Sequence, residues 1–88
     1  MKRFVRLDQK VGIEKLTEQE FQAHLRFMEQ SAEERSMMAG GFVGDAGGMV
    51  VFEADSKQEA KAWAKQDPLF ASGKYEFQIY EWHLVFNT

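Results

Sequence analysis

The chain has 88 residues, a formal net charge of −3 and a pI near 5.3, which suits one domain over residues 1–88 with a single core. Its eleven Lys and Arg are scattered among fourteen Asp and Glu, which argues against a nucleic-acid partner because such binding needs a clustered basic face. It contains no cysteine, so neither a disulfide framework nor a thiolate zinc site is predicted.

The N-terminal residues, "MKRFVRLDQK", include basic side chains but no apolar run of the length that a signal peptide needs. No stretch approaches the roughly 18 apolar residues of a membrane span. We therefore expect a cytoplasmic protein without a membrane partner. Residues 3–7, "RFVRL", predict a short strand because three of the five are apolar, and the loop "DQKVGIEK" follows.

A capped helix is predicted next. "TEQE" at 17–20 has the S/T-x-x-E form of a capping box, so Thr17 should open the helix. The helix should end near "EERS" at 33–36. Its buried stripe is expected at helical spacing, at Phe21, Leu25, Met28 and Ala32.

Two strands around a glycine-rich turn follow, at about 36–43 and 48–54, with residues 44–47 between them. The five glycines of "AGGFVGDAGG" do not predict a phosphate-binding loop, because a strand and not a helix comes after them. The simpler interpretation is a hairpin turn with positive φ angles. Gly40 and Gly41 lie inside or at the end of the first strand, where glycine often marks a bulge or the close approach of a ligand.

The second helix carries an acidic residue where an apolar one is expected. "SKQE" at 56–59 is a second capping box, and Ala60, Trp63 and Ala64 begin a buried stripe. The next member of the stripe is Asp67, and Pro68 should end the helix there. Burial and the negative end of the helix dipole both oppose a carboxylate at this position.

The segment "YEFQIYEWHLVF" at 75–86 predicts a long last strand whose alternation changes phase. A bulge or a change of burial partner is expected near Tyr80-Glu81, because strand side chains alternate strictly between two faces. We expect the early half to face the helices and the later half to face another layer. The early row is Tyr75, Phe77 and Ile79, and the later row is Trp82, Leu84 and Phe86.

The predicted order β-α-β-β-α-β is the ferredoxin-like pattern of an α+β fold. Right-handed crossovers place both helices on one face of a four-stranded antiparallel sheet and leave the other face bare. Eight Phe, two Trp and two Tyr are many aromatic residues for one interior, so a ligand cavity or a partner subunit should take some of them. A homodimer that packs sheet against sheet, or a higher oligomer built from it, is the simplest arrangement.

His24 and Asp67 are the candidates for chemistry. His24 lies on the flank of the first helix's stripe, and Asp67 holds the inward position at the end of the second helix. Both should look into the space between the helices and the sheet. A carboxylate that contacts a histidine fixes its tautomer and raises its basicity, which suits a general base.

Each of these residues also has a structural interpretation. A histidine beside an apolar stripe is more often a satisfied edge residue, and an Asp before Pro commonly accepts backbone N–H bonds in a turn. His83, in the last strand, is the alternative imidazole and should face solvent or the dimer seam. Two histidines without cysteine argue against structural zinc, although His with carboxylates could hold another metal ion. We predict no cofactor.

The run from Gly47 to Phe86 resembles the C-terminal half of YciI-like (YCII-related) proteins in Ser56, Glu59-Ala60, Asp67-Pro68 and Gly73. "AHLRFM" at 23–28 and "MAGG" at 38–41 are similar to that family's His-Leu helix and Ala-Gly-Pro strand. The resemblance implies a dimeric α+β barrel with an active site at His24 and Asp67. Some family members are linked with dehydrochlorination of chlorinated hydroquinones.

The chain departs from the family pattern in three places. Gly41 stands where Pro is usual, and Leu69 where an aromatic residue commonly follows Asp-Pro. Phe21-Gln22 stands where Arg-Pro often precedes the histidine.

Two functions follow from these observations. The first is an enzyme of the lyase, isomerase or dehydrochlorinase kind, in which His24 transfers a proton of a small cyclic or aromatic substrate and Asp67 positions it. Gly40 and Gly41 would let the substrate approach the strand, and the candidate walls are Phe42, Trp63 and Phe70. The alternative is a non-catalytic module of the same fold that binds a small ligand or serves assembly.

Overall fold

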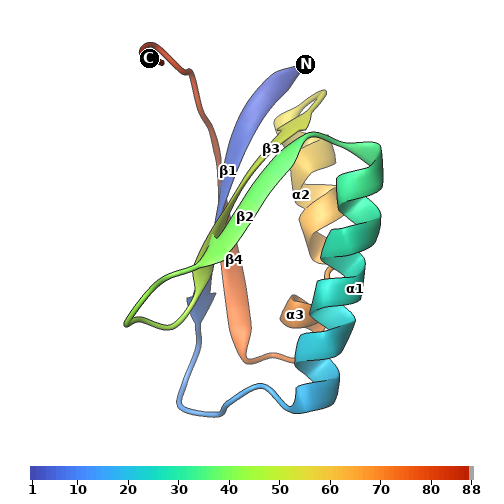
Figure 1. The fold of residues 1–88 in the computed structure, drawn as a ribbon, viewed down its shortest axis with the longest axis vertical. Coiled ribbons are helices and arrows are strands. Elements are labelled where there is room, and N and C mark those ends of the chain that lie inside the picture. The colour runs from blue at the N-terminus through green and yellow to red at the C-terminus, as the bar shows by residue number, and fades with distance from the viewer. Residues whose placement is uncertain (88) are drawn as a thin grey trace.

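The computed structural model describes residues 1–87 and confirms the ferredoxin-like α+β fold (Figure 1). Within these residues, four strands and two long helices follow the predicted order, and a third, short helix precedes the last strand. The elements are β1 (Lys2–Lys10), α1 (Glu18–Glu34), β2 (Met37–Gly41), β3 (Gly48–Ala54), α2 (Lys57–Lys65), α3 (Pro68–Ala71) and β4 (Tyr75–Glu81).

The strands form one antiparallel sheet in the order β2-β3-β1-β4, and the helices lie on one of its faces (Figure 1). The other face is bare and carries exposed apolar side chains, among them Met38, Met49 and Tyr80. No helix within residues 1–87 is both long enough and apolar enough to cross a membrane.

The apolar core lies between α2 and the three strands β3, β1 and β4. Trp63 of α2 is its centre: its ring lies 4.6 Å from that of Phe52 and 5.5 Å from that of Phe27. Its indole Nε1 donates a hydrogen bond of 2.9 Å to Ser31 of α1, so the polar edge of this buried ring is satisfied. The buried core residues are Phe4, Val50, Phe52, Ala54, Ala60, Trp63, Ala64 and Ile79.

Both long helices begin at the predicted residues. Thr17 and Glu20 form the full capping box, with hydrogen bonds of 3.1 and 2.8 Å. Ser56 caps α2 by accepting a 3.1 Å bond from the Glu59 N–H. The Glu59 carboxylate instead faces Arg35, at 3.4 Å, so the second capping box is only half formed.

Three strand boundaries differ from the prediction. β1 continues to Lys10 and so includes Asp8, Gln9 and Lys10 of the predicted loop. β2 ends at Gly41 and not at 43. The predicted strand through Phe86 is wrong, because β4 ends at Glu81, opposite Phe4 near the start of β1. One further hydrogen bond, from the Trp82 N–H to the Arg3 carbonyl at 2.8 Å, joins the chain to β1 after the strand has ended.

The phase change near Tyr80-Glu81 therefore marks the end of the strand and not a bulge, since the pairing of β1 with β4 runs without a gap through Glu81. After Trp82, residues 83–87 leave the sheet (Figure 1). The first half of the segment behaves as predicted: Ile79 is buried, and Phe77 packs against the core below α2.

Candidate active site

A cavity of about 560 Å³ lies under α1, between this helix and the β2-β3 end of the sheet. It exists because the inward sheet positions under α1 are small: Ala39, Gly41 and Gly48 offer no side chain beyond Cβ. The predicted apolar stripe of α1 forms the roof instead of closing onto the sheet. Phe21, Leu25, Met28 and Ala32 all line the cavity.

A buried arginine organises the floor of the cavity. Arg6 of β1 is completely buried and donates from Nε and Nη2 to the two oxygens of Asp8, each over 2.8 Å. Its Nη2 also lies 3.0 Å from Oδ2 of Asp67. The guanidinium is placed over two rings, 5.1 Å from the Trp63 centroid and 4.9 Å from that of Phe70. One cation thus holds two carboxylates in fixed positions.

Asp67 and His24 are in contact, as predicted. Nδ1 of His24 lies 2.9 Å from both oxygens of Asp67, and the two residues are 43 positions apart in the chain. Because an ionised carboxylate only accepts, Nδ1 is the donor, which leaves Nε2 without a protein partner among residues 1–87. The His24 side chain is 15% exposed, whereas Asp67 is fully buried.

Asp67 also has the structural role that was the alternative. α2 ends at Lys65, and Asp67 is the N-cap of α3, accepting a 2.9 Å bond from the Leu69 N–H. The two interpretations do not exclude each other, because one carboxylate has enough lone pairs for Leu69, His24 and Arg6 together.

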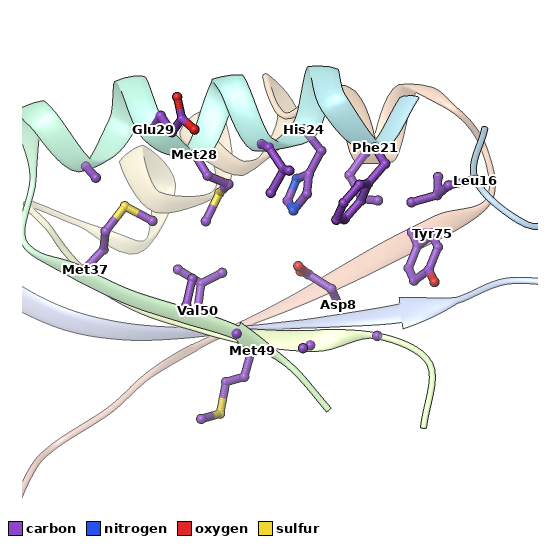
Figure 2. A pocket seen from close by; sticks show the side chains of 18 residues that line it. Asp8, Leu16, Phe21, His24, Met28, Glu29, Met37, Met49, Val50 and Tyr75 are labelled. Atoms are coloured by element: carbon purple, nitrogen blue, oxygen red, sulfur yellow. The ribbon is translucent and has the colours of Figure 1, made fainter. Parts of the chain in front are cut away.

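Asp8 is the carboxylate that faces the cavity. Figure 2 shows it rising from β1 toward the ring of His24, and both side chains belong to the cavity wall. Burial raises the pKa of Asp8 above its ordinary value, although the hydrogen bonds and the charge of Arg6 act in the opposite direction. Within residues 1–87, no three potential ligands of the His, Asp and Glu type are arranged to hold a metal ion.

The other predicted site residues divide into two groups. Gly40 and Gly41 line the cavity, whereas Phe42, Trp63 and Phe70 do not. Phe42 lies beside Met38, Met49 and Val51 in a shallow depression of β2-β3.

Trp63 is part of the core, and Phe70 packs against Phe77 with 4.9 Å between ring centroids. Both rings contact the guanidinium of Arg6, so they help to position the ionic cluster although neither lines the cavity. His83 is exposed and lies beyond the end of β4.

Arg6 and Asp8 were not predicted as site residues, although the sequence contains the signal. Phe4, Arg6 and Asp8 alternate along β1, so all three face the helices, while Val5 and Leu7 face the bare side. The number of apolar residues was enough to predict the strand. The alternation of its side chains shows in addition that the buried face changes from apolar, at Phe4, to charged, at Arg6 and Asp8.

The fold and the site together define a class of protein: a ferredoxin-like α+β domain with a buried ionic cluster under a cavity of small-molecule size. Ligand pockets typically have volumes of about 300–1,000 Å³, and the cavity of about 560 Å³ falls in this range. The YCII-related domain family matches residues 3–83. The chain belongs to this family, which confirms the resemblance in its sequence.

Two relatives extend the comparison. The chain is 42% identical over 72 residues to the uncharacterized protein YjpA of Bacillus subtilis (strain 168), covering 81% of this chain and 85% of YjpA. The fold of this chain is similar to that of the 5-chloro-2-hydroxyhydroquinone dehydrochlorinase TftG from Burkholderia phenoliruptrix AC1100, solved in complex with 2,5-dihydroxybenzoquinone. That similarity has a TM-score of 0.73 at 16% identity over 92% of this chain and 93% of TftG, and at this identity it shows the fold alone.

Proposed function

We propose that the protein is an enzyme that transfers a proton on a small cyclic or aromatic molecule, with His24 as the catalytic residue and Asp67 as its positioning residue. The observation that carries the proposal is the contact of Asp67 with Nδ1 of His24 at the edge of the cavity. It fixes one ring nitrogen as a donor to protein and leaves Nε2 for the ligand. The reaction class would be a lyase, an isomerase or a dehydrochlorinase like TftG.

The geometry gives each side chain a step. Nε2 of His24 would remove a proton from the bound molecule, and the imidazolium that forms would be stabilised by the Asp67 carboxylate. The same nitrogen would return the proton to another atom of the substrate or to a leaving group. Arg6 prevents Asp67 from rotating away, since its Nη2 lies 3.0 Å from Oδ2 of Asp67 and both side chains are fully buried.

The cavity wall supports a small and largely apolar substrate. Most of the wall is aliphatic, aromatic or glycine, which suits the flat face of a ring. Each of the three places at which the chain departs from the family pattern contributes one residue to this wall, namely Phe21, Gly41 and Leu69, whereas Gln22 does not line it. We propose that they adapt the cavity to a ligand that differs in shape from those of family members with the usual residues.

The tautomer of His24 provides the first test. Nitrogen-15 NMR on the whole chain should show Nδ1 protonated and Nε2 unprotonated in the neutral ring. His83 is exposed and provides an internal control in the same spectrum. Asp67→Asn should weaken this preference, because an amide can present its N–H₂ to Nδ1 as readily as its oxygen. A wild-type ring protonated on Nε2 would contradict the proposal.

Activity is the second test. Once a ring compound that the enzyme converts has been found by screening, His24→Gln should lower kcat by about 10²–10⁴-fold, the usual contribution of a general base. If His24→Gln still binds such rings and the wild type converts none of them, the chain is instead a ligand-binding module of the same fold.

We also propose a homodimer through the bare face of the sheet. Met38, Met49 and Tyr80 on this face are 72%, 41% and 50% exposed, which is unusual for large apolar side chains that share one face of a sheet. Val51 lies among them, paired with Met38 and Val5. Val51→Lys should give a folded monomer in light scattering, and a wild-type monomer at micromolar concentration would contradict the proposal. The cytoplasmic location stays a prediction.

A further inference from the structure

Asp8 is a second side chain at the cavity that can exchange hydrogen bonds with a ligand. Its carboxylate is held by two bonds from Arg6, one to each oxygen, and its side chain is 8% exposed. Each oxygen of an ionised carboxylate has a second lone pair. Because Asp8 belongs to the cavity wall and points upward between β1 and α1, its remaining acceptor capacity is directed to whatever occupies the cavity (Figure 2).

Apart from His24, which is charged only when protonated, the charged side chains of the wall have one sign. Asp8 and Glu29 are the acidic residues that line the cavity, and no Lys or Arg within residues 1–87 belongs to its wall. Arg6 lies outside this wall: it is completely buried, its Nε and Nη2 bind Asp8 and Asp67, and its Nη1 has no hydrogen-bond partner within residues 1–87. The titratable groups near Asp8 are Arg6 from its own strand, His24 from α1, Asp67 at the start of α3 and Tyr75 from the neighbouring strand β4.

We infer that Asp8 accepts a hydrogen bond from a hydroxyl group of the ligand, so that the cavity selects uncharged, hydroxyl-bearing rings and rejects carboxylates and phosphates. This inference rests on the proposed function, since it names the substrate class of the same site. Arg6 is the positioning residue: it prevents Asp8 from turning away and leaves only acceptor atoms toward the ligand.

Two physical arguments support the selection. A carboxylate ligand would place a second negative charge beside Asp8 in a partly dry site, where like charges repel more strongly than in water. A hydroxyl ligand would instead satisfy an acceptor that is otherwise buried without a second partner. Burial raises the pKa of Asp8, and a carboxylate of higher pKa is a stronger hydrogen-bond acceptor.

The test compares two ring compounds of similar size, hydroquinone and benzoate, by NMR titration of the amide spectrum of the full chain at neutral pH. In the wild type, hydroquinone should shift the amides of Gly47, Gly48 and His24 and bind at least about tenfold more tightly than benzoate, a difference of about 1.4 kcal/mol. Asp8→Asn should reduce this preference about tenfold or more. Asp55→Asn removes the same charge from an exposed residue outside the cavity wall and should keep the wild-type preference.

Each outcome has one meaning. Equal binding of the two compounds by the wild type, or an Asp8→Asn variant that keeps the wild-type preference, overturns this inference and leaves the proposed function intact. If neither compound shifts the cavity amides, both proposals fail. If Asp8→Asn loses the dispersed spectrum of a folded protein, the wild-type comparison decides alone, because it needs no variant.

Discussion

The two long helices share one face of the sheet and similar sequence signals, yet they do different things. α2 presses three buried residues, Ala60, Trp63 and Ala64, against large side chains such as Phe52 and forms a core. α1 has a single buried residue, Ser31, and its apolar stripe covers an open cavity. The difference originates in the sheet: where the inward residues are phenylalanines the helix packs, and where they are glycine and alanine it spans a space.

Arg6 lies where these two regions meet, and its removal should cause the largest loss of unfolding free energy. Arg6→Ala would leave Asp8 and Asp67 buried without their cation, and breaking a buried ion pair in this way costs about 3–5 kcal/mol. Urea denaturation should show this loss of unfolding free energy, or no folding at all. Arg3→Ala, on the same strand but exposed, should change it by less than about 0.5 kcal/mol. A loss below about 1 kcal/mol for Arg6→Ala would mean that the cluster is not electrostatically coupled.

Gly47→Ala should cause the next largest loss of stability. The change lies in the β2-β3 hairpin, next to the cavity. Its φ is +95°, and a Cβ there would lie 2.1 Å from the Asp8 carbonyl oxygen, so Gly47→Ala must displace backbone. Gly44 has a φ of +85° with nothing within 4 Å, so Gly44→Ala should cost only the roughly 1–2 kcal/mol of a left-handed residue. Thermal melting of the two variants measures the difference. Equal costs would show that the hairpin is a turn with no packing role.

A matched pair of alanines tests the comparison of the helices directly. Ala60 of α2 is completely buried, so Ala60→Leu should overpack the core and cost about 1–3 kcal/mol. Ala32 of α1 lines the cavity, so Ala32→Leu should cost less than about 0.5 kcal/mol because the added atoms enter open space. Both values come from urea denaturation. If Ala32→Leu were the more damaging variant, α1 would be packed and the cavity would be closed in solution.

Glu20, at the start of α1, should have the smallest effect and a distinct pH dependence. Its bond of 2.8 Å from Lys74 and its part in the capping box lower its pKa below the ordinary value of 4.5. A depressed pKa in the folded state means stability that is present above the ordinary value and lost as the pH falls through the lowered one. Glu20→Gln should therefore be slightly less stable than the wild type at neutral pH and equal to it in strong acid.

Lys74→Met provides the control for this prediction. In that background Glu20→Gln should have a smaller effect, because the larger of the two causes of the lowered pKa is already removed. An undiminished effect would assign the stabilisation to the capping box alone.

Local patterns in the sequence specified most of the fold. The caps at Thr17 and Ser56, the hairpin glycines and the order of elements all involve neighbours in the chain. The end of β4 was not predictable in this way, because it depends on where β1 begins, more than seventy residues earlier.

The contact of His24 with Asp67 was predicted from helix geometry and a shared sheet face. Their third partner, Arg6, was not predicted. Strand parity places its side chain on the inner face of the sheet, but its contact with Asp67 depends on the folded position of a residue far along the chain. A buried arginine is rare without partners. Its two carboxylates come from different elements, so only the folded chain reveals that it is paired.

The way in which α1 is attached has a consequence for motion. The helix is held by a few discrete links, among them Ser31 to Trp63, His24 to Asp67 and Glu20 to Lys74, instead of by a continuous packed face. Segments with few buried apolar contacts open locally at a lower free energy than the core. We expect the amide hydrogens of α1 to exchange with solvent before those of α2 and β1. Breathing of this one helix would admit and release a ligand while the sheet stays folded.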